Sequence, residues 1–347
     1  MKTKLPGISY EVTSSCNLNC RYCYNHWKCN DSSPRSSNSY KEALRTLKKL
    51  MQLADFNQVS FTGGEPLMAE RFSELVLYAR MKGRQVAVIS NGNFGGFREY
   101  ENLVKLGVAL FELPVHSCFP ECHDYLTGTA GSWLRSTEII RGLMLQKTDV
   151  VAVIVLTRVN CLEIEKTISF IRSLGITRIM LNRFNLGGQG LQEMKNLLMS
   201  AGELNAAFSK ASDMAIKLKL SISSNVCTPI CILDPDKYSG IRFSFCSSDF
   251  TRRPLTLDIL GNLRFCNHSP VELGNIFKNT LEEILTSFGA EAWKNTIPGF
   301  CKDCKAYYRC QGGCRAASEQ MGYGLDHPDP LLDFTLPDEV ELSRLKS

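Results

Sequence analysis

The sequence predicts an α/β protein built on a parallel sheet, followed by a smaller cysteine-rich region. Up to about residue 220, short apolar segments rich in Val and Ile alternate with segments of helical periodicity. Beyond that point the alternation stops, and six cysteines follow at short spacings. Six β–α units imply parallel strands joined by right-handed crossovers. The periodicity leaves open whether the sheet is open or curved into a barrel.

Six strands are expected in the first part of the chain. Each candidate is a short run of apolar and β-branched residues, which is typical of strands buried on both faces of a parallel sheet. The expected strands cover residues 8–13, 58–62, 85–90, 108–115, 150–156 and 177–181.

Helices are expected between these strands. Ser39 and Glu42 have the spacing of a capping box, which predicts that a helix begins there. Gly107 and Gly175 stand where a glycine would end a helix, and residues 206–218 form the expected sixth helix. The apolar faces of the first two helices recur at helical spacing: Leu44, Leu47, Met51 and Ala54, then Phe72, Leu75, Val76 and Ala79.

The second part of the chain gives weaker signals. Residues 255–259 and 263–265 flank a Leu-Gly-Asn turn and predict a hairpin. Residues 280–288 predict one short helix, and the rest is expected to be cysteine-rich loop. We divide the chain into a core (1–220), a bridging segment (221–245), a cysteine-rich domain (246–330) and an acidic tail (331–347).

Composition argues against several classes of protein. The net charge is only +5, and no Lys/Arg-rich run indicates a nucleic-acid partner. No run of 18 apolar residues predicts a membrane span, and no signal peptide is recognisable. The 15 cysteines fall into tight groups, as metal ligands do. These features predict a cytoplasmic protein without nucleic-acid or membrane partners.

Three cysteines near the N-terminus carry the main functional signal. Cys16, Cys20 and Cys23 are spaced C-x3-C-x2-C. A four-iron cluster needs four ligands, so three thiolates would leave one iron open to a chelating substrate. A zinc site with a distant fourth ligand, or chance, are the alternatives. The Gly-Gly-Glu-Pro run that begins at Gly63, directly after an expected strand, favours the cluster.

Together these motifs, with Tyr22 before the last cysteine, resemble the radical S-adenosylmethionine (SAM) enzymes. The resemblance implies a partial (β/α)6 barrel with its site at the carboxyl ends of the strands, a [4Fe-4S] cluster and SAM. It implies that Cys16, Cys20 and Cys23 hold the cluster. Residues expected to contact SAM are Gly63, Gly64 and Glu65 at the amino group, Tyr22 near the adenine, Ser90 and Asn91 at the ribose, and Arg183 at the carboxylate.

A second constellation has the pattern C-x14-G-x4-C, from Cys246 through Gly261 to Cys266, and then C-x2-C-x5-C-x3-C. It resembles the SPASM domain, which implies two auxiliary [4Fe-4S] clusters; a zinc ribbon is the alternative. The implied sets are Cys246, Cys266 and Cys314 for the first, and Cys301, Cys304 and Cys310 for the second.

The seventh cysteine of the SPASM pattern is missing after Cys314. We expect an oxygen or nitrogen ligand from Asp326, His327 or Asp329 to complete the second cluster. Two upstream thiols, Cys227 and Cys231, are the rivals, and we expect them at the first auxiliary cluster instead. The remaining cysteines are expected to be small, partly buried residues: Cys29, Cys118, Cys122 and Cys161.

The resemblance implies a radical SAM/SPASM maturase that removes a hydrogen atom from a ribosomally made peptide and installs a crosslink, a thioether or an oxidised or epimerised centre. His268 and His116 are the candidate bases. The anaerobic sulfatase-maturing branch has an aspartate at the position of Asn267. Because an amide cannot act as a base, the sequence argues against that activity. The rival functions are a dehydrogenase of a small metabolite or tetrapyrrole precursor and an iron-sulfur electron carrier.

The expected partners are a peptide substrate and an electron donor such as flavodoxin or ferredoxin. Only about ten residues precede the strand that leads to Cys16. Leader-peptide recognition is therefore expected from a separate protein.

Overall fold

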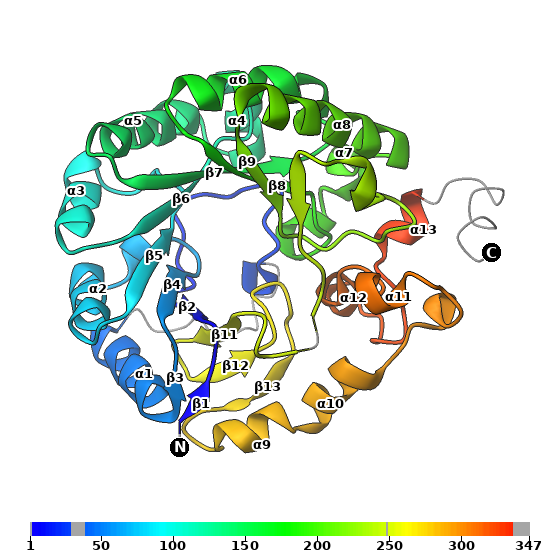
Figure 1. Cartoon of the computed structure of the whole chain (residues 1–347). Coiled ribbons are helices and arrows are strands. Elements are labelled where there is room, and N and C mark those ends of the chain that lie inside the picture. The colour runs from blue at the N-terminus through cyan, green and yellow to red at the C-terminus, as the bar shows by residue number, and fades with distance from the viewer. Residues whose placement is uncertain (1, 29–38, 248, 336–347) are drawn as a thin grey trace.

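A single 11-stranded sheet runs through almost the whole chain and curves around a central opening (Figure 1). The computed structural model describes residues 2–28, 39–247 and 249–335. The strand order is β10-β9-β8-β7-β6-β5-β4-β2-β11-β12-β13, and every pair from β10 to β11 is parallel. A separate two-stranded sheet pairs β1 (Thr3–Lys4) with β3 (Ala54–Asp55).

All six expected strands are present and adjacent in the expected parallel arrangement. Along β2 the side chains alternate: the Tyr10 hydroxyl donates to the Ala43 carbonyl in the helix outside, whereas Ser9 lines the central cavity. The outer face of the sheet therefore builds the apolar core and the inner face is partly polar. The strands are β2 (Ile8–Glu11), β4 (Gln58–Thr62), β5 (Gln85–Ile89), β6 (Leu110–Pro114), β7 (Asp149–Leu156) and β8 (Arg178–Arg183).

Helices cover the outside of the barrel (Figure 1). They are α1 (Tyr40–Leu53), α2 (Phe72–Met81), α3 (Phe97–Lys105), α4 (Pro120–Thr127), α5 (Ser132–Leu145), α6 (Ile164–Ser173), α7 (Met194–Leu197) and α8 (Ala201–Leu218). The expected helix over 206–218 starts earlier, because Ser200 and Glu203 form a reciprocal capping box. Gly107 and Gly175 follow helix ends at positive φ, as expected.

The part after residue 220 continues the same sheet on both edges. Strands β9 (Ser221–Ser224) and β10 (Ile241–Phe243) extend it beyond β8. On the other edge, β11 (Leu255–Asp258) pairs with β2, and the expected hairpin to β12 (Asn262–Arg264) is confirmed, followed by β13 (Glu272–Asn275). The expected bridging segment and cysteine-rich domain thus share one sheet with the core.

The expected single helix over 280–288 is wrong, because Thr280 and Ser287 each cap a separate helix. The expected loop beyond it also contains short helices. These elements are α9 (Leu281–Leu285), α10 (Phe288–Asn295), α11 (Tyr307–Cys310), α12 (Arg315–Gln320) and α13 (Leu331–Thr335). Residues 336–347 of the expected acidic tail, and Cys29, lie outside the described residues.

Short 3-10 turns connect several of the elements. They are η1 (His26–Lys28), η2 (Pro66–Met68), η3 (Cys161–Glu163), η4 (Gly188–Leu191), η5 (Pro235–Lys237) and η6 (Gly299–Cys301). Among the helices of the described residues, none has the length and apolar character needed to cross a membrane.

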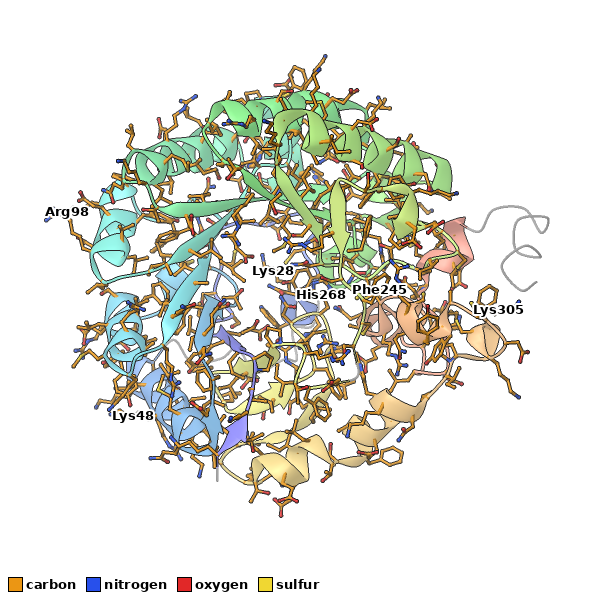
Figure 2. The ribbon with its side chains drawn as sticks, viewed as in Figure 1. Lys28, Lys48, Arg98, Phe245, His268 and Lys305 are labelled. Carbon is orange, nitrogen blue, oxygen red and sulfur yellow. The ribbon has the colours of Figure 1, made fainter. Side chains whose placement is uncertain are left out.

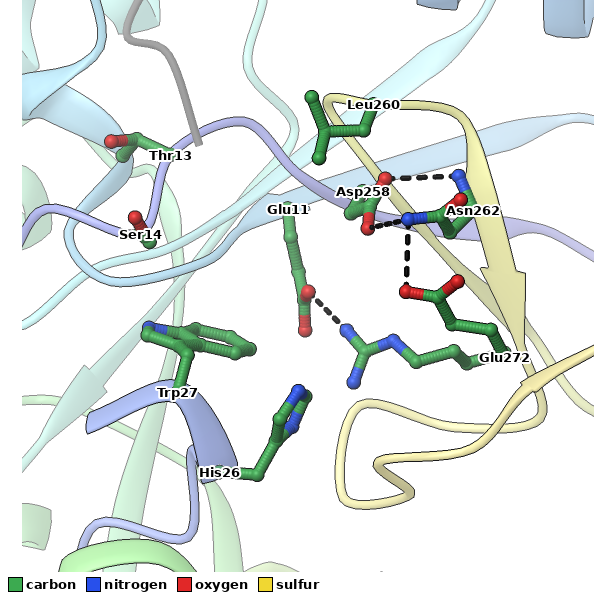
Figure 3. Close-up of a pocket in the computed structure, with 10 residues that line it drawn as sticks. Glu11, Thr13, Ser14, His26, Trp27, Asp258, Leu260, Asn262 and Glu272 are labelled. Atoms are coloured by element: carbon green, nitrogen blue, oxygen red, sulfur yellow. Dashed lines mark hydrogen bonds and ion pairs between the residues drawn. The ribbon is translucent and has the colours of Figure 1, made fainter. Parts of the chain in front are cut away.

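Two buried ion pairs join the C-terminal part to the barrel. Arg264 of β12 pairs with Glu11 of β2, and Arg183 of β8 pairs with Asp329. Figure 3 shows Glu11 in a small cavity of about 120 Å³ that lies between η1 and the β11–β12 hairpin. Removing one partner of a buried ion pair lowers the stability of the fold by about 3–5 kcal/mol, because the other charge is left buried without compensation. These pairs therefore fix how the C-terminal part sits on the barrel.

Candidate active site

The barrel encloses a cavity of about 480 Å³, a size suited to a cofactor and part of a substrate. The three thiols Cys16, Cys20 and Cys23 line it together with inward-facing residues of the strands. In Figure 2, Lys28 and His268 lie at the central opening of the ring. The structure therefore brings the expected cysteines and glycines together inside the barrel, on the loops that follow β2 and β4.

Gly63 and Gly64 let the loop after β4 lie directly against the segment that leads into Cys16. The Gly64 amide donates to the Thr13 carbonyl and the Glu65 amide to the Ser15 carbonyl, both at 2.8 Å. A Cβ on either glycine would come within 2.2 Å of one of those carbonyl oxygens. Glycine is thus required sterically at both positions.

The cysteine loop brings three thiols and one cation together. Burial raises the pKa of Cys20 to about 12, and the neighbouring thiols of Cys23 and Cys16 add to this, while Lys28 opposes it. The Lys28 ammonium donates to the Leu18 carbonyl at 2.8 Å, inside the same loop. Three soft donors around a cavity, with a compensating positive charge, fit an iron-sulfur cluster. Within the described ranges, no three His, Cys, Asp or Glu side chains form a group that could hold a single metal ion.

Glu65 has a different position from the expected one. It is fully buried, and its carboxylate accepts hydrogen bonds from the Leu67 amide (3.2 Å), the Ser90 hydroxyl (2.9 Å) and the Asn91 amide (2.7 Å). Burial raises its pKa to about 7 against these hydrogen bonds. The carboxylate therefore joins the loop after β4 to the loop after β5. Gly63 and Gly64 line the cavity, whereas Glu65 is not among its lining residues.

Ser90 and Asn91 both line the cavity, but their polar groups already have partners. The Ser90 hydroxyl bonds Glu65 and the Tyr100 hydroxyl. The Asn91 side-chain amide donates to Asn17 at 2.9 Å and points to the sulfur of Cys16 at 3.9 Å. The structure thus brings Asn91 to the cysteine loop, and Ser90 holds the loop in place.

His116 supports Tyr22. Its Nε2 lies 2.6 Å from the Tyr22 hydroxyl, and its Nδ1 accepts the Val155 amide at 3.2 Å. Because Nδ1 accepts, Nε2 carries the proton and donates to Tyr22. Burial, and then His123, hold the pKa of His116 well below its usual range. The ring has no free lone pair for a substrate proton, so its expected use as a base is replaced by the positioning of Tyr22.

His268 lies on the wall between this cavity and a neighbouring one of about 320 Å³. Its Nδ1 is 2.6 Å from the Asn185 amide nitrogen, and the ring packs on Tyr24 with the centroids 3.8 Å apart. Burial lowers its pKa to about 3, and nearby arginines add to this effect. A base of that strength, with its acceptor nitrogen engaged, is poorly suited to proton removal near neutral pH.

Arg183 also departs from the expected role. Its Nε donates to the Thr228 hydroxyl at 3.1 Å, its Nη1 to the Phe184 carbonyl at 3.2 Å, and its Nη2 contacts both the Cys227 carbonyl and the Asp329 carboxylate. The guanidinium is committed to the C-terminal part of the chain. We therefore no longer assign it to a SAM carboxylate.

Sequence reasoning missed Glu112 and Lys28. Glu112 faces the cavity from β6, and burial raises its pKa to about 7, with Arg178 opposing. An acid within an expected apolar strand is a signal that could have identified it. Lys28 carries no such signal, because its position depends on how the cysteine loop folds.

The C-terminal cysteines form two groups of four. Cys227, Cys246, Cys266 and Cys314 line the 320 Å³ cavity beside His268; we call them the inner group. Cys231, Cys301, Cys304 and Cys310 line a separate pocket; we call them the outer group. Cys227 is thus with the inner group, as expected, whereas Cys231 is not.

Three further cysteines of the described residues belong to none of these groups. Cys118 and Cys122 are partly exposed and Cys161 is buried. This agrees with the expectation of small, partly buried residues.

Comparison with known proteins identifies the family. The model of the radical SAM superfamily matches residues 10–199. The chain is similar to the PqqA peptide cyclase of Granulibacter bethesdensis, with 23% identity over 331 residues that cover 93% of this chain and 86% of that protein. For the PqqA peptide cyclase of Xanthomonas axonopodis pv. citri, the identity is 24% over 342 residues, covering 94% and 87%.

Solved structures share the fold. Streptococcus suis SuiB bound to its precursor peptide SuiA superposes with a TM-score of 0.71 at 14% identity, covering 94% of this chain and 75% of that one. Native anSMEcpe with bound AdoMet superposes with a TM-score of 0.72 at 15% identity, covering 97% and 99%. The barrel with its C-terminal extension is therefore a fold that these two solved structures share.

Proposed function

Because the chain belongs to the radical SAM superfamily, we propose that this enzyme modifies a ribosomally made peptide, forming a crosslink, a thioether or another oxidised or epimerised centre. The observation that carries the proposal is the 480 Å³ cavity, in which three thiols meet the backbone of Gly63 and Gly64. The similarity to peptide cyclases over more than nine-tenths of this chain supports a peptide substrate. So does SuiB, which has the same fold and binds a precursor peptide.

Cys16, Cys20 and Cys23 would hold a [4Fe-4S] cluster, which would supply the one-electron reduction of SAM that makes removal of a hydrogen atom from the substrate possible. The protein orients these partners and excludes water. The backbone of Gly63 and Gly64 would meet the amino group of SAM. Tyr22, held by His116, would lie beside the adenine. Glu65 keeps the loops after β4 and β5 in register for this.

Two further [4Fe-4S] clusters are proposed at the inner and outer cysteine groups. Eight thiols in two sets of four support this, since such clusters take four thiolate ligands. Arg253 lies among the inner thiols, and its Nη1 donates to the sulfur of Cys246 at 3.6 Å. A buried cation there would offset the charge of a thiolate-bound cluster. We propose a small flavodoxin or ferredoxin as the electron donor and a separate protein for leader-peptide binding.

The test uses two triple variants with the same number of cysteine-to-alanine changes. One removes Cys16, Cys20 and Cys23; the control removes Cys118, Cys122 and Cys161. After anaerobic reconstitution, 5′-deoxyadenosine is measured with SAM and dithionite, and a candidate peptide encoded next to the gene is examined by mass spectrometry. We expect the first variant to lose SAM cleavage and peptide modification, and the control to keep both. Cleavage by the first variant at the wild-type rate would refute the site.

A further inference from the structure

We propose that Cys231, and not an oxygen ligand after Cys314, completes the outer auxiliary cluster. One short loop, residues 227–231, then supplies a thiolate to each auxiliary cluster, Cys227 to the inner one and Cys231 to the outer one. This inference rests on the proposed function only in requiring that auxiliary clusters are bound. It concerns which side chains ligate them.

The outer group consists of four thiols that line one pocket. Cys231 shares its pocket with Cys301, Cys304 and Cys310, and the other walls are mostly apolar, including Ile230 and Leu332. Cys231 therefore adds a fourth sulfur to the pocket that the three downstream thiols line.

The backbone also ties the loop to this group. The amide of Ile230, the residue before Cys231, donates to the sulfur of Cys310 at 3.4 Å. The Pro229 carbonyl accepts the Ile232 and Leu233 amides at 2.9 and 3.0 Å, so a tight turn sets the direction of the Cys231 side chain. Hydrogen bonds from amides to sulfur are typical of iron-sulfur sites, where they tune the potential.

The other end of the loop belongs to the inner group. The Cys227 thiol hydrogen-bonds Cys246 and lines the same cavity as the other inner thiols. Arg183 fixes the loop between the two thiols, with its Nη2 2.8 Å from the Cys227 carbonyl and its Nε 3.1 Å from the Thr228 hydroxyl. Arg183 therefore acts as a positioning residue for both cysteines.

Of the three ligands expected from residues 326–329, two have other partners and the third is exposed to solvent. The Asp329 carboxylate pairs with Arg183 and accepts the Cys314 amide at 2.8 Å and the Leu331 amide at 3.0 Å. It therefore lies at the backbone of Cys314, which belongs to the inner group. Asp326 is exposed, and His327 directs its Nε2 to Asp333 at 3.7 Å. The expectation that this stretch completes the outer cluster is thus replaced by Cys231.

This arrangement has a consequence for the substrate. With four thiolates for each auxiliary cluster, no iron in either group is left for a peptide ligand. Among the three cysteine sites of the described chain, only the loop of Cys16, Cys20 and Cys23 has three thiols. The open coordination position is therefore confined to the cavity that would hold SAM.

Two measurements test the assignment. The first needs no variant: the reconstituted full-length protein is treated with iodoacetamide before and after iron is removed with a chelator, and each cysteine is located by mass spectrometry. We expect Cys231 to be protected until the iron is removed, while the partly exposed Cys118 and Cys122 are alkylated throughout. Alkylation of Cys231 in protein that retains its full iron content would overturn the proposal.

The second compares Cys231→Ala and Cys231→Ser with Asp326→Asn, a change at an exposed candidate ligand, using Cys161→Ala as the matched control. We expect roughly 12 irons per chain in the wild type, from three four-iron clusters. Either Cys231 variant should lose about one to four irons, or show an altered outer-cluster signal by Mössbauer and electron paramagnetic resonance. The Cys161→Ala control and Asp326→Asn should keep the wild-type signal. An unchanged outer cluster in both Cys231 variants would overturn this assignment alone, whereas about four irons in the wild type would overturn the auxiliary clusters as well.

Discussion

Replacing Gly64 by alanine should disable SAM cleavage without unfolding the barrel. The new Cβ would lie 2.2 Å from the Ser15 carbonyl oxygen and 2.6 Å from its carbon, both backbone atoms. Real Cβ contacts essentially never fall below 3.0 Å, so this segment must move by at least about 0.8 Å. The hydrogen bond from the Glu65 amide to the same oxygen, now 2.8 Å, would then break. Cys16 is the next residue, so its thiol moves with the segment.

A displacement of about 1 Å in a catalytic site can cost about 100-fold in rate. We therefore expect Gly64→Ala to form 5′-deoxyadenosine about 100 times more slowly than the wild type under reducing conditions, with its far-ultraviolet circular dichroism unchanged. Gly202→Ala is the matched control, because it lies in α8 and its nearest foreign atom is 4.0 Å away. That control should cleave SAM normally and gain up to about 1 kcal/mol of stability, since alanine favours a helix over glycine. A Gly64→Ala enzyme within about threefold of the wild type, against the expected cost of misplacement, would refute this steric reasoning.

Three further outcomes are expected. Lys28→Met should lower the reduction potential of the N-terminal cluster in an anaerobic redox titration, because a positive charge beside its thiolates is lost; Lys28→Arg should restore most of it, and equal potentials in all three proteins would contradict the charge effect. Arg183→Leu should cost about 3–5 kcal/mol in urea unfolding with little change in the KM for SAM, and adding Asp329→Leu should recover part of that loss; fully additive losses would exclude coupling. Glu112→Gln should change how stability depends on pH. The native pKa of Glu112 is raised to about 7 from 4.5, so the wild type should lose stability as pH rises between these values, by up to about 1.4 kcal/mol per pH unit; parallel curves for the two proteins would contradict that shift.

The six β–α units were predictable because their signals are local, whereas the closure into a barrel was implied only by the family resemblance. Each β–α unit needs only a short apolar run, an amphipathic helix and a glycine stop, and those patterns are set by neighbouring residues. The division into one helix over 280–288 failed for an equally local reason, since Ser287 caps a second helix within the same stretch. The parallel pairing of β11 with β2 had no local signal, because it joins residues about 250 positions apart.

The site was predictable where one loop carries the chemistry. Cys16, Cys20 and Cys23 meet because they are neighbours in sequence, and the two glycines are required by the backbone they approach. The roles of Glu65, His116 and Arg183 were not predictable, because each depends on hydrogen-bond partners that come from distant parts of the sequence. Motif position alone does not tell whether a carboxylate faces the cavity or the loop behind it.

The three cysteine sites lie next to one another because neighbouring sites share residues or a loop. The cavity around Cys16, Cys20 and Cys23 and the inner-group cavity share a common wall made of Ser9, Asn225, Val226, Pro254, Asn267 and His268. The inner and outer groups share the loop of residues 227–231, and the Asn185 amide contacts both His268 and the sulfur of Cys314. Each site thus shares lining residues or a loop with the next. A substitution in a shared residue should affect two sites at once, whereas one at Glu112 of β6, which lines only the first cavity, should affect only the first.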